Sequence, residues 1–231
     1  MSSSSSPKPS ASDHTSVYAD LPPDKRDRLR HYDVLNTLAR KGQTVFAGSS
    51  LMEHFPVYEL QLASGTNHRI YNRGVSGFVT TELLLGLDAC VLDLAPSRLF
   101  INIGTNDVAS PEYRPDELIA NYEAILTRIG NALPDCRIFL MAYYPVNGEA
   151  EFPYTDREGM REVLSRRTNE ATRQANEAVK TLAERLGHPF IDVNEGLTDE
   201  RGNLKEEYST DGIHMFASGY AVVWENLLRY L

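Results

Sequence analysis

The sequence is poor in cysteine and has no long apolar run, and these two absences exclude several classes of protein. Only two of its 231 residues are cysteines, Cys90 and Cys136, and both stand in apolar surroundings. Two such residues lack the paired spacing of a zinc site. A single disulfide between them is possible, but we expect two reduced thiols in the core. No segment reaches the roughly 18 apolar residues that a membrane span needs, and none resembles a signal peptide. The sequence therefore predicts a cytoplasmic protein with no membrane span.

Positive charge is scarce as well. The chain has 23 lysines and arginines against 32 aspartates and glutamates, which gives a net charge of -9. Nucleic acids and anionic membranes both favour clustered Lys and Arg, so neither is an expected partner. The length suits one sizeable core. The Ser- and Pro-rich start predicts a disordered tail over residues 1–18, followed by a single domain over residues 19–231.

Short apolar segments alternate with segments of helical periodicity along this domain. In one of the helical segments, Leu118, Tyr122 and Ile125 recur at spacings of three and four. Short buried strands separated by helices are typical of a parallel sheet covered on both faces. We therefore expect an α/β fold with three α/β/α layers and a flavodoxin-like five-stranded parallel sheet. The predicted strands are residues 44–48, 69–72, 98–103, 137–142 and 190–193, and the main predicted helices cover residues 21–41, 51–63, 80–94, 118–133, 164–186 and 220–231.

An acidic residue and a histidine stand three apart near the end of the chain, in Asp211-Gly212-Ile213-His214. A carboxylate at this spacing can hydrogen-bond one nitrogen of the imidazole and leave the other free to take a proton. Taken alone, the pair is also compatible with a capping Asp and an exposed His. The remaining histidines, among them His54, have no acidic residue at a useful spacing in a strand-end loop and are expected to be structural.

Three further polar segments follow predicted strands. Gly48-Ser49-Ser50-Leu51 joins the first strand to a helix, where a serine is either a cap or a nucleophile. Asn72-Arg73-Gly74-Val75-Ser76-Gly77 follows the second strand, and its Ser76 is the rival nucleophile. Gly104-Thr105-Asn106-Asp107 follows the third strand, and the amide of Asn106 can close a turn or donate to an oxyanion. Right-handed crossovers bring the carboxyl ends of parallel strands together at one edge, so we expect these segments to meet.

Together the four segments resemble the SGNH hydrolase superfamily, also called GDSL esterases and lipases. That family is named after a Ser, a Gly, an Asn and a His in four such blocks, and the resemblance covers the chain from about Gln43 to Leu231. One block departs from the pattern, because Ser49 stands where the family usually has Asp, while Ser50 aligns with the nucleophile. In order, the blocks read G-S-S-L, R-G-x-S-G, G-T-N-D and D-G-I-H.

The resemblance implies a role for each aligned residue. Ser50 would be the nucleophile, His214 the general base and Asp211 the residue that orients it. The oxyanion hole would consist of the N–H groups of Ser50 and Gly74 and the side-chain amide of Asn106. No metal or organic cofactor is needed for this chemistry. The implied substrate is a small-molecule carboxylic ester with a short acyl group, acetyl included, attached to a carbohydrate or a lysophospholipid.

Several alternatives remain open on the sequence alone. An acyltransferase or a thioesterase would use the same triad. A non-catalytic, flavodoxin-like module could instead bind a phosphate at Gly48-Ser49-Ser50, and a catalytically inactive relative could bind carbohydrate or protein. The aromatic segment over residues 143–154 could wall the pocket, form a lid, or simply pack its own side chains. Nothing in the sequence indicates an oligomeric state.

Overall fold

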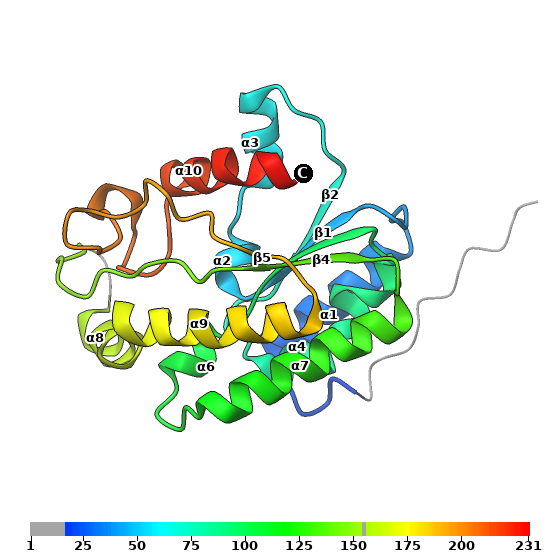
Figure 1. The fold of residues 1–231 in the computed structure, drawn as a ribbon, viewed down its shortest axis with the longest axis horizontal. Coiled ribbons are helices and arrows are strands. Elements are labelled where there is room, and N and C mark those ends of the chain that lie inside the picture. The colour runs from blue at the N-terminus through cyan, green and yellow to red at the C-terminus, as the bar shows by residue number, and fades with distance from the viewer. Residues whose placement is uncertain (1–16, 154–155) are drawn as a thin grey trace, which may run out of the picture.

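A five-stranded, entirely parallel sheet forms the centre of the protein (Figure 1). The computed structural model describes residues 17–153 and 156–231. The strands lie in the order β2-β1-β3-β4-β5, so the chain starts near one edge, reverses direction after β2 and then crosses to the other edge. This confirms the predicted sheet. The strands are β1 (Thr44–Gly48), β2 (Ile70–Gly74), β3 (Arg98–Asn102), β4 (Arg137–Met141) and β5 (Phe190–Ile191).

Helices cover both faces of the sheet, as expected for three α/β/α layers (Figure 1). Successive strand residues point to opposite faces, so Val45 belongs to one apolar core and Phe46 to the other. The first core lies under α1 (Pro23–Asn36), α4 (Thr80–Leu85), α5 (Leu87–Cys90), α7 (Pro115–Ala132) and α9 (Asn169–Leu186). The second lies under α2 (Ser50–Glu53), α3 (Val57–Ser64) and α10 (Ala217–Leu227). The remaining elements are α6 (Thr105–Ala109), α8 (Arg157–Arg166) and the short 3-10 turns η1 (Leu92–Leu94), η2 (Glu206–Tyr208) and η3 (Leu228–Tyr230).

Three predicted helices are wrong in extent because each is interrupted. The predicted helix over residues 51–63 is divided into α2 and α3 by Pro56, which disfavours helical geometry in the residue before it. The predicted helix over residues 80–94 breaks at Gly86, where a Cβ atom would lie 2.9 Å from Leu29 of α1. The long helix predicted over residues 164–186 is two helices, α8 and α9. Thr168 lies between them and caps α9 by accepting a hydrogen bond from the N–H of Ala171 at 3.0 Å.

Two smaller differences concern strand ends and the tail. β5 ends at Ile191 rather than at residue 193, because Asp192 turns the chain by accepting a hydrogen bond from the N–H of Asn194 at 2.9 Å. Residues 1–16 of the predicted tail lie outside the described residues. Its last residue, Tyr18, is buried and donates to the Asp33 carboxylate at 3.2 Å, so the packed part of the chain includes it.

Both cysteines are free thiols, as predicted. Cys90 is fully buried and Cys136 is half-buried. Burial raises the pKa of Cys90 to about 12 and that of Cys136 to about 11, so neither is a reactive thiolate at neutral pH. Within residues 17–153 and 156–231, no helix is long and apolar enough to cross a membrane.

Candidate active site

The carboxyl ends of β1, β2 and β3 bring the first three polar segments side by side. Gly48, the last residue of β1, is in register with Gly74 on one side and with Asn102 on the other. The strands approach so closely here that a Cβ atom on Gly48 would lie 2.1 Å from the carbonyl oxygen of Asn102. Glycine is therefore required at this position, and the chain can turn directly from β1 into α2.

Ser50, the first residue of α2, meets the fourth segment at this edge. Its Oγ lies 2.9 Å from Nε2 of His214, and Nδ1 of the same ring lies 2.6 Å from Oδ2 of Asp211. An ionised carboxylate only accepts hydrogen bonds, so Nδ1 carries the proton and Nε2 is left to accept from the serine hydroxyl. The three residues that the resemblance implied thus form a continuous relay across 164 positions of the chain.

A tight turn holds Asp211 and His214 in this geometry. Ser209 pairs with Met215 in an isolated antiparallel bridge, and the Ser209 hydroxyl also donates to the His214 carbonyl at 2.9 Å. Gly212 lies inside the turn at a φ of 92°, and a Cβ atom there would be 2.3 Å from the Asn147 carbonyl oxygen. Only glycine fits this left-handed position against the neighbouring loop. The spacing of three between acid and histidine is therefore set by the turn.

Hydrogen bonding keeps the Asp211 carboxylate ionised. Burial is the largest single influence and raises the pKa of Asp211. The contact with the His214 ring and the hydrogen bonds from two backbone N–H groups lower it, and together they outweigh burial. Those N–H groups belong to Ile213, at 2.8 Å, and His214, at 2.7 Å. The net effect lowers the pKa below its usual value, so the carboxylate is charged at neutral pH and can stabilise an imidazolium on His214.

Ser49, the departure from the family pattern, forms hydrogen bonds through its backbone but not through its side chain. Its carbonyl accepts from the N–H groups of Met52 and Glu53 and so begins α2. Its side chain is buried, and Oγ has no hydrogen-bond partner among the described residues. The residue helps to start α2 through its backbone, and the hydroxyl takes no part in the relay.

The N–H of Gly74, which the resemblance assigned to the oxyanion hole, is already in use. It donates to Oδ1 of Asn72 at 3.0 Å. A Cβ atom on Gly74 would lie 2.2 Å from the backbone nitrogen of Glu53, so the glycine is needed where α2 packs against the end of β2. This contact explains the glycine without a catalytic role.

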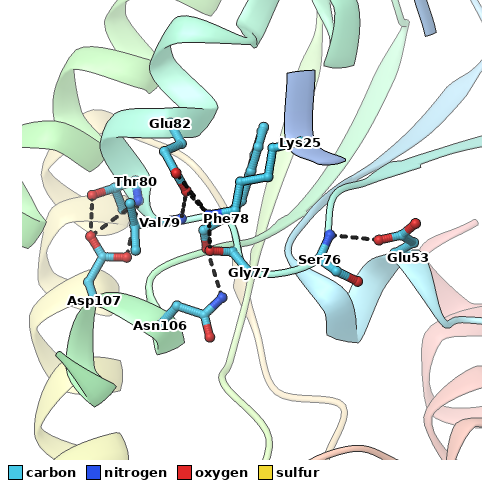
Figure 2. Close-up of polar contacts among 10 residues, drawn as sticks. All are labelled: Lys25, Glu53, Ser76, Gly77, Phe78, Val79, Thr80, Glu82, Asn106 and Asp107. Carbon is cyan, nitrogen blue, oxygen red and sulfur yellow. Dashed lines mark hydrogen bonds and ion pairs between the residues drawn. The ribbon is translucent and has the colours of Figure 1, made fainter. Parts of the chain in front are cut away.

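The loop that follows, residues 75–80, is held by side chains at five consecutive positions (Figure 2). Two backbone hydrogen bonds also hold this loop. The N–H of Val75 donates to the Gly48 carbonyl, and the N–H of Phe78 donates to the Val75 carbonyl. Within this 75–80 loop, the N–H of Gly77 alone donates to no described residue. The five side-chain contacts are Glu53 to the N–H of Ser76, Lys25 to the carbonyl of Gly77, Asn106 to the carbonyl of Phe78, Glu82 to the N–H of Val79 and Asp107 to the N–H of Thr80.

The side chain of Asn106 is held next to Gly77 by a hydrogen bond to the 75–80 loop. The Nδ2 atom of Asn106 donates to the carbonyl of Phe78, the residue after Gly77, at 2.9 Å. An amide NH₂ group has two protons, so this bond orients the side chain and leaves one proton for another acceptor. Gly77 itself has a φ of 73°, a left-handed conformation that favours glycine. Its place between the contact to Glu53 of α2 and the contact to Asn106 of α6 is visible in Figure 2.

Ser76, the rival nucleophile, is not brought to a base. Its N–H donates to Glu53 at 2.6 Å, and among the described residues its hydroxyl is bonded to none. His54, expected to be structural, instead lies beside the site, with its ring centroid 5.5 Å from that of His214. No spacing in the sequence indicates this, because His54 reaches the site only through its position at the end of α2.

The aromatic residues of the segment 143–154, after β4, differ in their positions. Tyr143 and Tyr144 are buried, one in each of the two apolar cores, and Tyr154 lies outside the described residues. Phe152 lines a cavity of about 140 Å³, together with Leu164 of α8 and Asp211. No cluster of three His, Cys, Asp or Glu side chains able to hold a metal occurs in residues 17–153 and 156–231, and the absence of a cofactor stays a prediction.

The three-layer fold and the Ser50–His214–Asp211 relay define an α/β serine hydrolase. A sequence model of the GDSL-like Lipase/Acylhydrolase family matches residues 44–222. The chain belongs to this family, which confirms the SGNH resemblance. The phosphate-binding alternative has no role for the His214 and Asp211 side chains that the fold brings to Ser50.

Individual relatives agree with this assignment. A Streptococcus pneumonia structure, provisionally described as a platelet activating factor, is 32% identical, has a TM-score of 0.77, and the match covers 90% of this chain and 92% of that one. An acetylxylan esterase from Geobacillus stearothermophilus shares the fold, with 19% identity, a TM-score of 0.60 and coverage of 82% and 94%. The GDSL esterase/lipase WDL1 of Oryza sativa subsp. japonica is 27% identical over 145 residues, 59% of this chain. That match spans about half, 54%, of the rice protein's length.

Proposed function

We propose that the protein is a serine esterase that hydrolyses short-chain carboxylic esters, acetyl esters included, through an acyl-serine intermediate. The observation that carries this proposal is the relay of Asp211, His214 and Ser50, with contacts of 2.6 and 2.9 Å. A serine hydroxyl is a poor nucleophile at neutral pH and needs such a base. His214 takes the proton of Ser50 as the oxygen attacks the ester carbonyl, and then returns it to the leaving alcohol. Water attacks the acyl-serine in the second half of the cycle, with His214 again as the base.

Three donors are proposed for the oxyanion that forms on the carbonyl oxygen. The N–H of Ser50, as the first helical residue of α2, has no acceptor within its own helix. The second proton of the Asn106 amide and the N–H of Gly77 complete the set. Gly77 replaces Gly74 in this role, because the Gly74 N–H is bonded to Asn72 whereas the Gly77 N–H is free of any described acceptor. Fixed donors of this kind are usually the largest single contribution to catalysis.

The cavity lined by Asp211 lies at the acid end of the triad, and Ser50 and His214 are not among its lining residues. Its volume of about 140 Å³ is well under the roughly 300–1,000 Å³ of pockets that enclose drug-sized ligands. The apolar side chains of Phe152 and Leu164 line it next to Asp211. The resemblance to the family favours short acyl groups over long buried chains, and short-chain acyl or acetyl esters of carbohydrates or lysophospholipids are the proposed substrate classes.

The proposal is tested by labelling and turnover. The protein is incubated with p-nitrophenyl acetate, and separately with a fluorophosphonate whose site of attachment is located by mass spectrometry. We expect turnover and a single label on Ser50. Ser50→Ala and His214→Ala should each lower kcat by about 10⁶-fold, and Asp211→Asn by less, about 10⁴-fold.

Ser76→Ala is the matched control, since Ser76 stands in the neighbouring segment without a base, and we expect it to retain activity. Full turnover by Ser50→Ala would rule the assignment out. A panel of acetylated sugars, lysophospholipids and acyl-thioesters, each with and without an alcohol acceptor, then separates ester hydrolysis from thioester hydrolysis and from acyl transfer.

A further inference from the structure

Helix α1 contacts the 75–80 loop, although α1 precedes the residues 44–222 that match the family. Lys25 makes the first contact. Its Nζ donates to the Gly77 carbonyl at 2.8 Å and to both carboxylate oxygens of Glu82, at 2.8 and 2.6 Å. Glu82 in turn accepts the N–H of Val79 at 3.1 Å. One lysine of α1 thus holds the backbone on the C-terminal side of Gly77, directly and through a carboxylate (Figure 2).

Arg28, one turn further along α1, makes the second contact. Its Nη2 pairs with Oε1 of Glu53 at 2.5 Å, while Oε2 of Glu53 accepts the N–H of Ser76 at 2.6 Å. Glu53 is the last residue of the short helix that begins with Ser50. Glu53 therefore connects the residue before Gly77 to α2, and Arg28 connects Glu53 to α1.

We propose that α1 is a two-point clamp that orients the Gly77 N–H, with Lys25 and Arg28 as positioning residues for the oxyanion hole. This inference rests on the proposed function. An oxyanion donor acts only if it already points at the place where charge develops, because charge stabilisation is lost when the donor must first reorient. The clamp holds the 75–76 and 77–78 peptide units, one on each side of the 76–77 unit that carries the Gly77 N–H, and leaves that N–H unbonded. It should therefore act on the transition state and hardly on the binding of the neutral ester.

The two arms of the clamp differ in strength. The side chains of Lys25 and Glu82 are 15% and 16% exposed, so solvent and salt screen their attraction only weakly. Arg28 is 45% exposed, and an ion pair of that kind contributes less. Lys25 also bonds the Gly77 carbonyl directly, whereas Arg28 acts through Glu53. Loss of Lys25 should accordingly be the more damaging change.

The test measures kcat and KM for p-nitrophenyl acetate together with the thermal midpoint of unfolding. The main variant is the double substitution Lys25→Met and Glu82→Gln. It leaves no unpaired buried charge and keeps an acceptor for the Val79 N–H, but it removes the donor to the Gly77 carbonyl. We expect kcat to fall by about 10- to 100-fold, with KM unchanged and the midpoint close to that of the unaltered protein. Lys25→Arg, which keeps a charged donor, should recover most of the activity, and Arg28→Met should lose less than the double variant.

Arg30→Met is the matched control, since Arg30 is exposed on the same helix and forms no hydrogen bond or ion pair with any described residue. Its kcat should equal that of the unaltered protein. A double variant that folds and keeps full kcat, or one whose KM rises while kcat is constant, overturns the clamp. If the double variant fails to fold, an unchanged kcat in Arg28→Met overturns the clamp instead. If the unaltered protein neither turns over the ester nor labels at Ser50, the proposed function fails, which is a different result from the failure of the clamp alone.

Discussion

Asp211 bonds His214 through both of its carboxylate oxygens. Oδ2 accepts from the ring nitrogen Nδ1 at 2.6 Å, and Oδ1 accepts from the backbone N–H of the same histidine at 2.7 Å. One carboxylate therefore fixes the position of the residue as well as the orientation and tautomer of its ring. The short spacing allows both contacts, because the intervening Gly212 turns the chain back on itself. Orientation of the imidazole and closure of the turn are thus one structural feature.

The lowered pKa of Asp211 gives a prediction for stability against pH. Hydrogen bonds from His214 and Ile213 favour the charged carboxylate more than burial disfavours it. A group whose pKa is lower in the folded state contributes stability above its ordinary pKa of about 3.9, and loses it as the pH falls through the folded-state value. The stability advantage over Asp211→Asn should therefore be constant from pH 7 to about 5 and shrink below about 4. Urea denaturation at each pH measures it, with Asp135→Asn, an exposed aspartate, as the control. An advantage that grows on acidification would contradict hydrogen bonding to the charged carboxylate as the cause of the lowered pKa.

Replacement of Asn106 should impair catalysis more than folding. Asn106→Ala removes the proposed side-chain donor to the oxyanion together with the contact that holds the Phe78 carbonyl. We expect kcat to fall by about 10²–10³-fold, which corresponds to roughly 3–4 kcal/mol of transition-state stabilisation, while KM stays similar. Steady-state kinetics with p-nitrophenyl acetate measures this, and circular dichroism checks the fold. Asn131→Ala, an exposed asparagine of α7, is the control. A kcat near that of the unaltered protein would remove Asn106 from the oxyanion hole.

Ser49 offers a test of the one departure from the family pattern. Its buried hydroxyl has no partner among the described residues, and a buried polar group left unbonded costs about 1–3 kcal/mol. Ser49→Ala should therefore unfold at the same or a higher urea concentration, with kcat unchanged, because the contribution of Ser49 to α2 is made by its backbone carbonyl. Ser209→Ala is a useful contrast, since that hydroxyl bonds the His214 carbonyl and the Gly212 N–H, and its loss should lower stability. Destabilisation by Ser49→Ala would mean that the hydroxyl has a bonded partner in solution.

The sheet and the meeting of Ser50 with His214 and Asp211 could be predicted from the sequence because both depend on local patterns. Strand-length apolar segments and the crossover rule place Ser50 and Asn106 at one edge. The resemblance to the family then selects His214 as the base. The interruption of one helix also has a local signal, since Pro56 lies inside the helix predicted over residues 51–63. Thr168, in contrast, fits the apolar stripe of a longer helix, and only the structure shows that it caps α9.

The choice between Gly74 and Gly77 could not be made from the sequence. It depends on which N–H group finds an acceptor in the folded chain. The Gly74 N–H has a local acceptor in Asn72, whereas the Ser76 N–H donates to Glu53, 23 residues away. The clamp from α1 is of the same kind, because Lys25 and Gly77 are 52 residues apart. Contacts at such separations leave no periodic signal in the sequence.

Arg167, whose burial no pattern in the sequence indicates, provides the last prediction. It is 2% exposed, and its Nε and Nη2 atoms have no partner among the described residues. Burial is the largest influence and lowers its pKa to about 10, although the Asp211 and Tyr143 side chains favour the charge. The folded state thus holds the proton of Arg167 less tightly than the unfolded chain does. The charged guanidinium therefore lowers the stability of the folded state at neutral pH. This loss of stability diminishes only as the pH rises through about 10. Arg167→Met, of similar length and without the charge, should raise the free energy of unfolding at pH 7 by about 1–3 kcal/mol. Urea denaturation beside Arg30→Met measures the difference, and a loss of stability in Arg167→Met would show that the attraction to Asp211 outweighs the burial of the charge.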